Sequence, residues 1–223
     1  MMTASSDLGT AVLLVATPQP PEQTEAAREA GADAMRSDAA GRIVETAERL
    51  YRQFGHQKTT IADIARALSM SPANIYRFFR SKDAVNEAVC RRLLDDLVSL
   101  ATEVAHRRAT AADRFRALLL ELARLNLDRC RMHKQLHQLL AVAGSENWPV
   151  AAEHAARIET ILAAIIGDGM RRGEFRYGDA QRAGGCVHAA MTRYLHPTLI
   201  VDGGAVGQPM LDAMVDFCLA ALR

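Results

Sequence analysis

Apolar residues recur at helical spacing along most of the chain. Ile43, Ala47, Leu50 and Phe54 follow one another at steps of three or four residues, as on one face of an amphipathic helix. The same period predicts about nine helices, the main ones spanning 37–54, 61–68, 72–79, 82–108, 111–140 with a break near 130–132, 150–172, 180–195 and 210–222. The chain is therefore predicted to be all-α. An N-terminal three-helix head is expected at 36–83, followed by a larger C-terminal helical domain at 84–223.

Residues 59–83 have the pattern of two short helices joined by a tight turn. The first helix carries one apolar stripe from Ile61 to Leu68. Ser71 is a good N-cap for the second helix, and Pro72 suits its first position, where the missing N–H costs nothing. The second helix divides into two faces: an apolar one with Ile75, Phe78 and Phe79, and an outer one with Ala73, Asn74, Tyr76 and Arg77.

The outer residues of the second helix suit contact with nucleic acid. Arg77 could bridge the O6 and N7 atoms of guanine, Asn74 could bridge N6 and N7 of adenine, and Ala73 could approach a thymine methyl group. Further residues are of types that hydrogen-bond phosphate oxygens: Thr59, Thr60, Ser71, Tyr76 and Lys82. Periodicity alone leaves a second interpretation open, an ordinary helical hairpin with a solvated polar face.

The run TT-x-x-x-I-A, followed by N-I-Y-R-F-F-R-S-K-D-A-V, resembles the DNA-binding domain of TetR-type (tetracycline-repressor-type) transcriptional regulators. The resemblance covers about residues 37–97, with the helix-turn-helix at about 60–79. Its matching positions are Gly55, Thr59, Thr60, Ile64, Ala65, Ser71, Tyr76, Phe79, Ser81 and Lys82. Three positions depart from the family pattern: Ser69 replaces a turn glycine, His56 an aromatic residue, and Phe78 a frequent histidine. Ser69 can still occupy a tight turn, so these departures read as local variation.

Charge and composition agree with this arrangement. Of 223 residues 49% are hydrophobic, enough to bury a full core. Residues 36–83 carry nine Lys and Arg against five Asp and Glu, a net charge of +4, whereas residues 84–223 carry only +1. The basic excess thus coincides with the predicted DNA-reading head, where it would attract phosphate.

The N-terminal arm, residues 1–35, is predicted to be flexible and carries a net charge of −4. Its apolar run at 8–16 is too short to span a bilayer and no Lys or Arg precedes it, so neither a membrane span nor a secretory signal is expected. The four cysteines are scattered singly, which disfavours structural disulfides and a zinc cluster and favours a cytoplasmic location.

The C-terminal domain offers weaker candidates. His133 and His137 lie four residues apart and could face the same way, as metal ligands, as pocket-lining residues or as ordinary histidines. Because no third ligand stands at diagnostic spacing, no metal and no cofactor is expected. Trp148 could stack on a ligand or seal a core edge. The resemblance implies dimerisation through the last two long helices, to which Ala189 and Leu219 belong.

The resemblance implies a sequence-specific, dimeric regulator, more often a repressor, that binds a pseudo-palindromic operator in double-stranded DNA and is released by an unknown small-molecule effector. Two other classes stay open: an all-α enzyme that carries a helix-turn-helix, and a non-specific DNA-organising protein. The sequence contains no Ser-His-Asp order and no Gly-rich phosphate loop in its usual context, so an enzyme is not expected.

Overall fold

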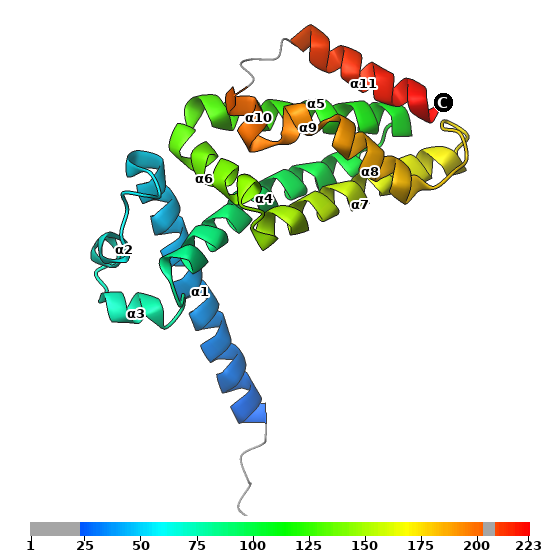
Figure 1. Ribbon diagram of the computed structural model, residues 1–223. Helices are drawn as coiled ribbons and strands as arrows, with labels where there is room; N and C mark the ends of the chain where they lie inside the picture. The colour runs from blue at the N-terminus through cyan, green and yellow to red at the C-terminus, as the bar shows by residue number, and fades with distance from the viewer. Residues whose placement is uncertain (1–22, 203–207) are drawn as a thin grey trace, which may run out of the picture. The chain divides into compact units, whose positions relative to one another are not determined.

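The computed structural model describes residues 23–202 and 208–223. These residues form eleven α-helices and no strand, which confirms the all-α prediction (Figure 1). The chain divides into two compact units, Met1–Ala39 and Ala40–Arg223. The helix-turn-helix and the C-terminal helices therefore belong to the same unit, and one continuous hydrophobic core runs through it.

The helices follow in the order α1 (Gln23–Phe54), α2 (Ile61–Ala67), α3 (Pro72–Tyr76), α4 (Lys82–Ala105), α5 (Ala111–Met132), α6 (Lys134–Ser145), α7 (Pro149–Arg171), α8 (Ala180–Ala190), α9 (Thr192–Leu195), α10 (Pro197–Asp202) and α11 (Gln208–Leu222). Two differences from the predicted helices stand out. The first helix begins at Gln23, upstream of its predicted start near residue 37, and the rest of the predicted flexible arm, residues 1–22, lies outside the described residues. The region after α8 also holds two extra short helices, because Pro197 starts a new helix instead of ending the last one.

In the head, local signals fix each turn. Gly55 ends α1 with a φ of 84°, a left-handed conformation that glycine adopts without strain. Ser69 has a φ of 56° in the turn between α2 and α3, so it occupies the position where a glycine is usual. The hydroxyl of Ser81 accepts a hydrogen bond from the backbone N–H of Ala84 and so caps α4.

The long helix α4 joins the head to the C-terminal domain. Near its start the Asn86 side-chain oxygen accepts a 2.7 Å hydrogen bond from the buried hydroxyl of Tyr51. One turn and a half later, Arg92 pairs with Glu48 at 3.0 Å. Both bonds join α4 to the last turns of α1, which belong to the head. A change in the position of α4 would therefore move this part of α1 as well.

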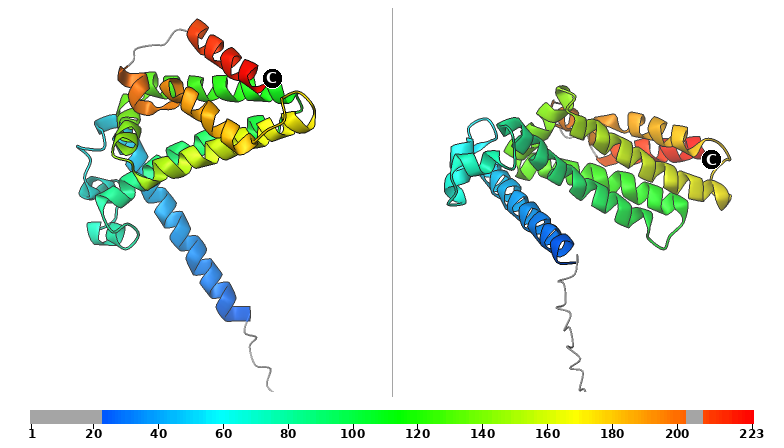
Figure 2. Two further views of the ribbon diagram at one scale, coloured as in Figure 1. Left: turned by 45° about the vertical axis from the view of Figure 1, so that its right-hand side comes forward. Right: turned by 90° about the horizontal axis from the view of Figure 1, so that it is seen from below.

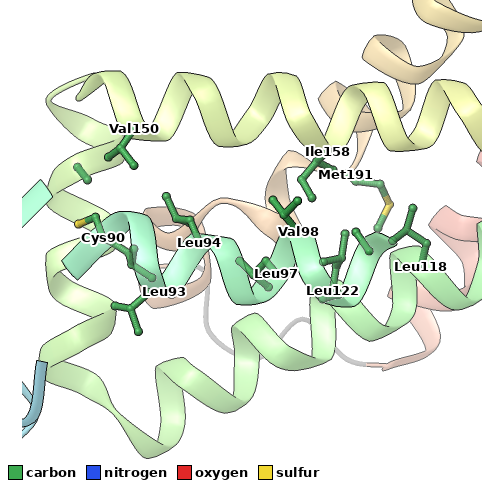
Figure 3. Packing of buried hydrophobic residues seen from close by; sticks show 14 of the residues in the cluster. Cys90, Leu93, Leu94, Leu97, Val98, Leu118, Leu122, Val150, Ile158 and Met191 are labelled. Atoms are coloured by element: carbon green, nitrogen blue, oxygen red, sulfur yellow. The ribbon is translucent and has the colours of Figure 1, made fainter. Parts of the chain in front are cut away.

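Further along, α4 packs against α5 and α7, as the views in Figure 2 show. Side chains of the three helices meet in the core, among them Leu97 and Val98 of α4, Leu122 of α5 and Ile158 of α7 (Figure 3). α8 lies against α7, and α11 contacts α5 and α8.

All four cysteines are free thiols. Cys90 is buried, and burial raises the pKa of its thiol to about 12. Cys186, by contrast, is exposed to solvent.

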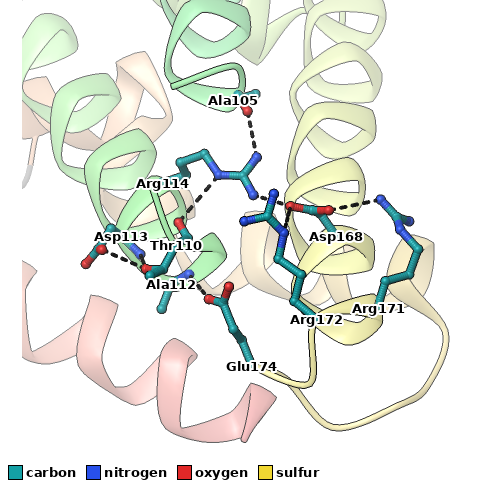
Figure 4. Close-up of polar contacts among 9 residues, drawn as sticks. All are labelled: Ala105, Thr110, Ala112, Asp113, Arg114, Asp168, Arg171, Arg172 and Glu174. Carbon is teal, nitrogen blue, oxygen red and sulfur yellow. Dashed lines mark hydrogen bonds and ion pairs between the residues drawn. The ribbon is translucent and has the colours of Figure 1, made fainter. Parts of the chain in front are cut away.

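A polar cluster holds the far ends of α4, α5 and α7 together (Figure 4). Arg114 of α5 donates to the backbone oxygen of Ala105 at 2.8 Å and forms an ion pair with Asp168 of α7. Glu174 accepts a hydrogen bond from the Ala112 N–H at 3.1 Å, at the N-terminal end of α5. Because Arg114 is buried, the Ala105 oxygen and the Asp168 carboxylate replace the water that its guanidinium loses on folding.

Candidate functional site

The outer face of α3 is the best-defined candidate surface. Ile75 is fully buried and anchors the helix, whereas Ala73, Tyr76 and Arg77 are exposed and Asn74 is half-buried. Tyr76 keeps 49% of its surface accessible, a high value for a large aromatic residue. The structure therefore places three of these predicted contacts on one short, anchored helix and the fourth, Arg77, at its C-cap.

The hydroxyls of Thr60 and Ser71 serve first as helix caps. Thr60 accepts from the Asp63 N–H at 3.2 Å while Asp63 accepts from the Thr60 N–H at 2.9 Å, a reciprocal capping box. The hydrogen bonds from Thr60 lower the pKa of Asp63 below its usual range. Ser71 accepts from the Asn74 N–H at 3.2 Å. Both residues are exposed at the starts of α2 and α3, where the helix dipole favours an anion such as phosphate.

Thr59 is not at the surface, contrary to the prediction that it contacts phosphate. It is 2% exposed, and its hydroxyl donates to the Gly55 backbone oxygen at 2.9 Å. This bond helps to close the turn after α1. The residue type alone suggested a phosphate contact, but its side chain packs inward.

Lys82 stands at the start of α4 and is half-buried. Its Nζ donates to the backbone oxygen of Gln57 at 3.3 Å, which ties the start of α4 to the loop after α1. The pKa of the neighbouring His56 is lowered, mainly by burial and secondarily by the charge of Lys82. An ammonium group held here is positioned by the fold and still reaches solvent.

Two further basic residues of the head are available for contact with DNA. Lys58 and Arg80 are exposed, and neither they nor Arg77 form an ion pair with any described residue. Arg66 and Arg52, by contrast, are paired with carboxylates of their own helices. The net charge of the head predicted a basic surface. A count of charged residues does not distinguish arginines that form ion pairs from those that do not.

The C-terminal domain contains a mostly apolar cavity of about 280 Å³. Its walls come from α4 to α10, including Leu94 and Leu97 of α4. Three histidines line it: His154 of α7, His188 of α8 and His196 before α10. Burial, with a smaller contribution from His188, lowers the pKa of His154 to about 4, so this imidazole is neutral at physiological pH.

The predicted ligand residues lie elsewhere. His133 and His137 border a separate, more polar hollow between α4, α5 and α6. The ring of His137 is buried, and its Nε2 lies 2.8 Å from the Pro197 backbone oxygen. Trp148 packs at the edge of the core and donates to Glu146 at 2.9 Å. None of the three lines the apolar cavity, and no described group of three or more His, Cys, Asp or Glu side chains could hold a metal ion.

The two predicted interface residues also differ from each other. Ala189 on α8 is exposed, as a residue must be in the single chain if it is to contact a second subunit. Leu219 on α11 is 5% exposed and belongs to the core of its own chain, so the prediction for Leu219 is wrong. The opposite face of α11 instead exposes Met210 and Phe217, at 63% and 68% of their surfaces.

Within the ranges 23–202 and 208–223, no helix combines the length and apolar character that crossing a membrane would require.

Comparison with known proteins assigns the two parts of the chain. Residues 43–89 match the family model for bacterial regulatory proteins of the tetR family, and residues 111–208 match the model for a tetracyclin repressor-like C-terminal domain. An uncharacterized HTH-type transcriptional regulator of Mycobacterium tuberculosis is 30% identical over 125 residues, which are 56% of this chain and 58% of that protein. The HTH-type regulator BetI of Burkholderia mallei is 31% identical over 94 residues, 42% of this chain and 47% of BetI. The matches thus span less than two thirds of these relatives.

Solved structures agree on the fold. A TetR/AcrR-family regulator from Thermobifida fusca superimposes with a TM-score of 0.61 at 22% identity, covering 83% of this chain and 99% of its own. RolR, crystallised with the ligand resorcinol, superimposes with a TM-score of 0.60 at 17% identity, covering 85% of this chain and 90% of its own. At such identities the likeness concerns the fold.

Proposed function

We propose that this chain, which belongs to the TetR family of transcriptional regulators, binds a pseudo-palindromic DNA operator as a homodimer and represses transcription until a small molecule releases it. The observation that supports this most directly is the outer face of α3. Arg77 and Tyr76 are exposed on a helix that Ile75 anchors from behind, in a head of net charge +4. In a helix-turn-helix the second helix enters the major groove, where such side chains can reach base edges.

The other head residues fit a role in positioning the protein on DNA. Thr60 and Ser71 lie at helix N-termini, and Lys58, Arg80 and Lys82 add positive charge in the segments next to α2, α3 and α4. Contacts of this type fix register on the duplex and supply the salt-dependent part of the affinity.

The cavity is the proposed effector site, because α4 connects it to the head. Leu94 and Leu97 of α4 line the cavity, while Asn86 and Arg92 of the same helix bond to Tyr51 and Glu48 of α1. A ligand that shifts α4 would therefore also shift the head. For release, the ligand must bind the conformation that does not fit DNA more tightly than the one that does.

The proposed dimer face consists of the exposed side chains of α8 and α11. Met210 and Phe217 protrude from α11, and Ala189 lies on α8, which contacts α11. Large exposed apolar side chains next to small ones suit close packing of a second subunit. A two-fold dimer presents two heads, which explains the expected palindromic operator.

Selection of bound sequences from random double-stranded DNA tests the proposed DNA recognition. The expected result is an enriched site with two inverted halves, bound far more tightly than the same bases in shuffled order. A binding affinity that is unchanged by shuffling would contradict specific recognition and favour a DNA-organising protein.

A further inference from the structure

A second hollow, of about 650 Å³, lies at the end of α4 that is opposite to the head. Its walls come from the ends of α4 and α7, the loop between α4 and α5, and the first turn of α5. It shares no lining residue with the apolar cavity, and α4, with 24 residues or about 36 Å of helix, separates it from the head. Five arginines line it: Arg107, Arg108, Arg114, Arg171 and Arg172.

Three of these arginines converge on one carboxylate (Figure 4). Arg114 forms an ion pair with Asp168, and Arg172 and Arg171 approach the same carboxylate to 3.0 and 3.3 Å. The hydrogen bond from Arg114, together with the charges of all three arginines, holds the pKa of Asp168 below its usual range. Asp168 is therefore fully ionised at neutral pH, yet its single negative charge leaves two of the three positive charges unbalanced.

The other two arginines differ in their partners. Arg107 is neutralised, because its guanidinium donates to both carboxylate oxygens of Glu121, at 2.5 and 3.0 Å. Arg108 is exposed and forms no ion pair within the ranges 23–202 and 208–223. It adds a third positive charge without a counter-charge to the two that Asp168 leaves.

Much of this charge remains accessible to a ligand. Arg171 approaches Asp168 only through Nη2 and Arg172 only through Nε, and their side chains are 73% and 53% exposed. Two more carboxylates of this region, Asp113 and Glu174, do not line the hollow. Each instead accepts a hydrogen bond at the N-terminal end of α5, from the Thr110 hydroxyl and from the Ala112 N–H.

Helix dipoles offset only part of the excess. Arginines are favoured at the C-terminal ends of helices, and both α4 and α7 end at the hollow. Each such end carries about half a negative elementary charge, while the N-terminal end of α5 carries about half a positive one. The sum cancels roughly half of one charge, so more than two positive charges still lack a counter-charge.

We infer that this hollow binds a small anion that carries a phosphate group, with Arg108, Arg171 and Arg172 as the binding residues. Guanidinium groups bind phosphate oxygens through paired N–H donors, and an excess of two to three charges suits a doubly or triply charged anion. The inference is independent of the proposed function. It concerns a site outside both the head and the apolar cavity, and it is tested without DNA.

Calorimetric titration of the full chain with pyrophosphate, at pH 7.5 and constant ionic strength, tests the inference. We expect one saturable site per chain, with an affinity at least tenfold higher than that for acetate, which has one charge. Parallel titrations with inorganic phosphate and glycerol 3-phosphate identify the source: the tighter of the two shows whether the site takes a free phosphate or a phosphate ester. No saturable binding, or equal affinity for pyrophosphate and acetate, would overturn the inference.

Variants locate the site. Arg108→Gln/Arg172→Gln should weaken pyrophosphate binding at least tenfold, because charge-assisted hydrogen bonds are lost. Both side chains are exposed, so the variant should fold with the melting temperature of the parent. Pyrophosphate should raise the melting temperature of the parent but not that of the variant.

The matched control is Arg124→Gln, at an arginine of α5 that is 83% exposed and lies outside the hollow, and it should bind pyrophosphate as the parent does. Arg77→Gln tests the alternative that pyrophosphate binds to the basic head. A loss of binding in Arg77→Gln with none in Arg108→Gln/Arg172→Gln would overturn the inference, as would an equal loss in the Arg124→Gln control.

Discussion

In the head, the candidate contacts come from residues 60–82, lie on or beside α2, α3 and the start of α4, and are exposed or half-buried. In the C-terminal domain, the candidate ligand contacts come from residues 94–197, lie on helices far apart in the sequence and line an interior cavity. The first surface needs only a small, locally capped unit. The second exists only when α4 to α10 are packed together.

This difference predicts opposite consequences of substitution. Side chains on the outer face of α3 contribute little to the core, so their removal should reduce DNA binding at constant stability. Side chains around the cavity contribute to packing, and one of them, His154, has a strongly lowered pKa, so substitution here should change stability and ligand binding together and, at His154, the pH response as well.

The largest effect is expected from a substitution in the proposed dimer face of α8 and α11. Phe217→Glu places a charge in the proposed dimer interface and should convert the dimer to a folded monomer. Losing the second head should lower operator affinity by about 10²–10⁴-fold, since the two heads then no longer bind as one unit. Analytical ultracentrifugation and operator titration on the same sample measure both effects.

The matched control is Met132→Glu, which alters a large apolar residue that is 76% exposed and stands at the end of α5, outside both α8 and α11. It should leave both properties unchanged. Leu219→Glu should behave differently from either, since Leu219 is buried in its own chain and a charge there should prevent folding. A Phe217→Glu protein that remains dimeric with normal affinity would place the interface elsewhere.

The second effect concerns the head alone. Arg77→Ala should cost about 1–3 kcal/mol per half-site and relax the sequence preference, because the exposed guanidinium is the best base-reading group on α3. The melting temperature should not change. Arg124→Ala, at an exposed arginine of α5, is the control and should bind DNA normally. An Arg77→Ala protein with the wild-type binding profile would show that Arg77 is only solvated.

The head could be predicted in detail because its signals are local. Ser71, Pro72 and Gly55 each encode a cap or turn within four residues of their own position, and the apolar stripe determines which face of α3 is exposed. The exception is Thr59, whose inward orientation depends on how the loop after α1 packs.

The cavity could not be predicted in this way. His133 and His137 were selected by their spacing of four residues, yet His137 is bound to a backbone oxygen of a distant segment. His154, His188 and His196 have no shared spacing, and only the packing of α7, α8 and the segment between α9 and α10 brings them to one cavity. For Leu219, the helical period correctly indicated a buried stripe but could not distinguish burial within the chain from burial between chains.

The third effect concerns the interior of the C-terminal domain. The pKa of His154 is about 4 in the folded protein and about 6.5 when unfolded, so the unfolded chain takes up a proton that the folded chain does not. Its contribution to stability is therefore complete above about pH 6.5 and is lost as the pH falls toward 4, by about 3 kcal/mol.

Urea unfolding at a series of pH values measures this dependence. His154→Leu should flatten it in part, while the lowered pKa values of His137 and His56 leave a residual slope. DNA affinity at pH 7 should be unaffected. An identical pH dependence in the variant and the parent would exclude His154 as a major source of acid destabilisation.

The smallest effect returns to the head and distinguishes positioning from base reading. Lys82→Ala should weaken binding to all DNA sequences alike and reduce the slope of log K against log salt concentration by about one, since one phosphate contact is lost. The effect should be modest, because the Lys82 ammonium already donates to the Gln57 backbone oxygen and must share or give up that bond to reach a phosphate. Lys134→Ala, at an exposed lysine of α6, should leave the slope unchanged. If Lys82→Ala instead lost affinity only for particular DNA sequences, at a constant salt slope, Lys82 would be a base-reading residue. The phosphate contacts would then have to come from residues such as Lys58 and Arg80.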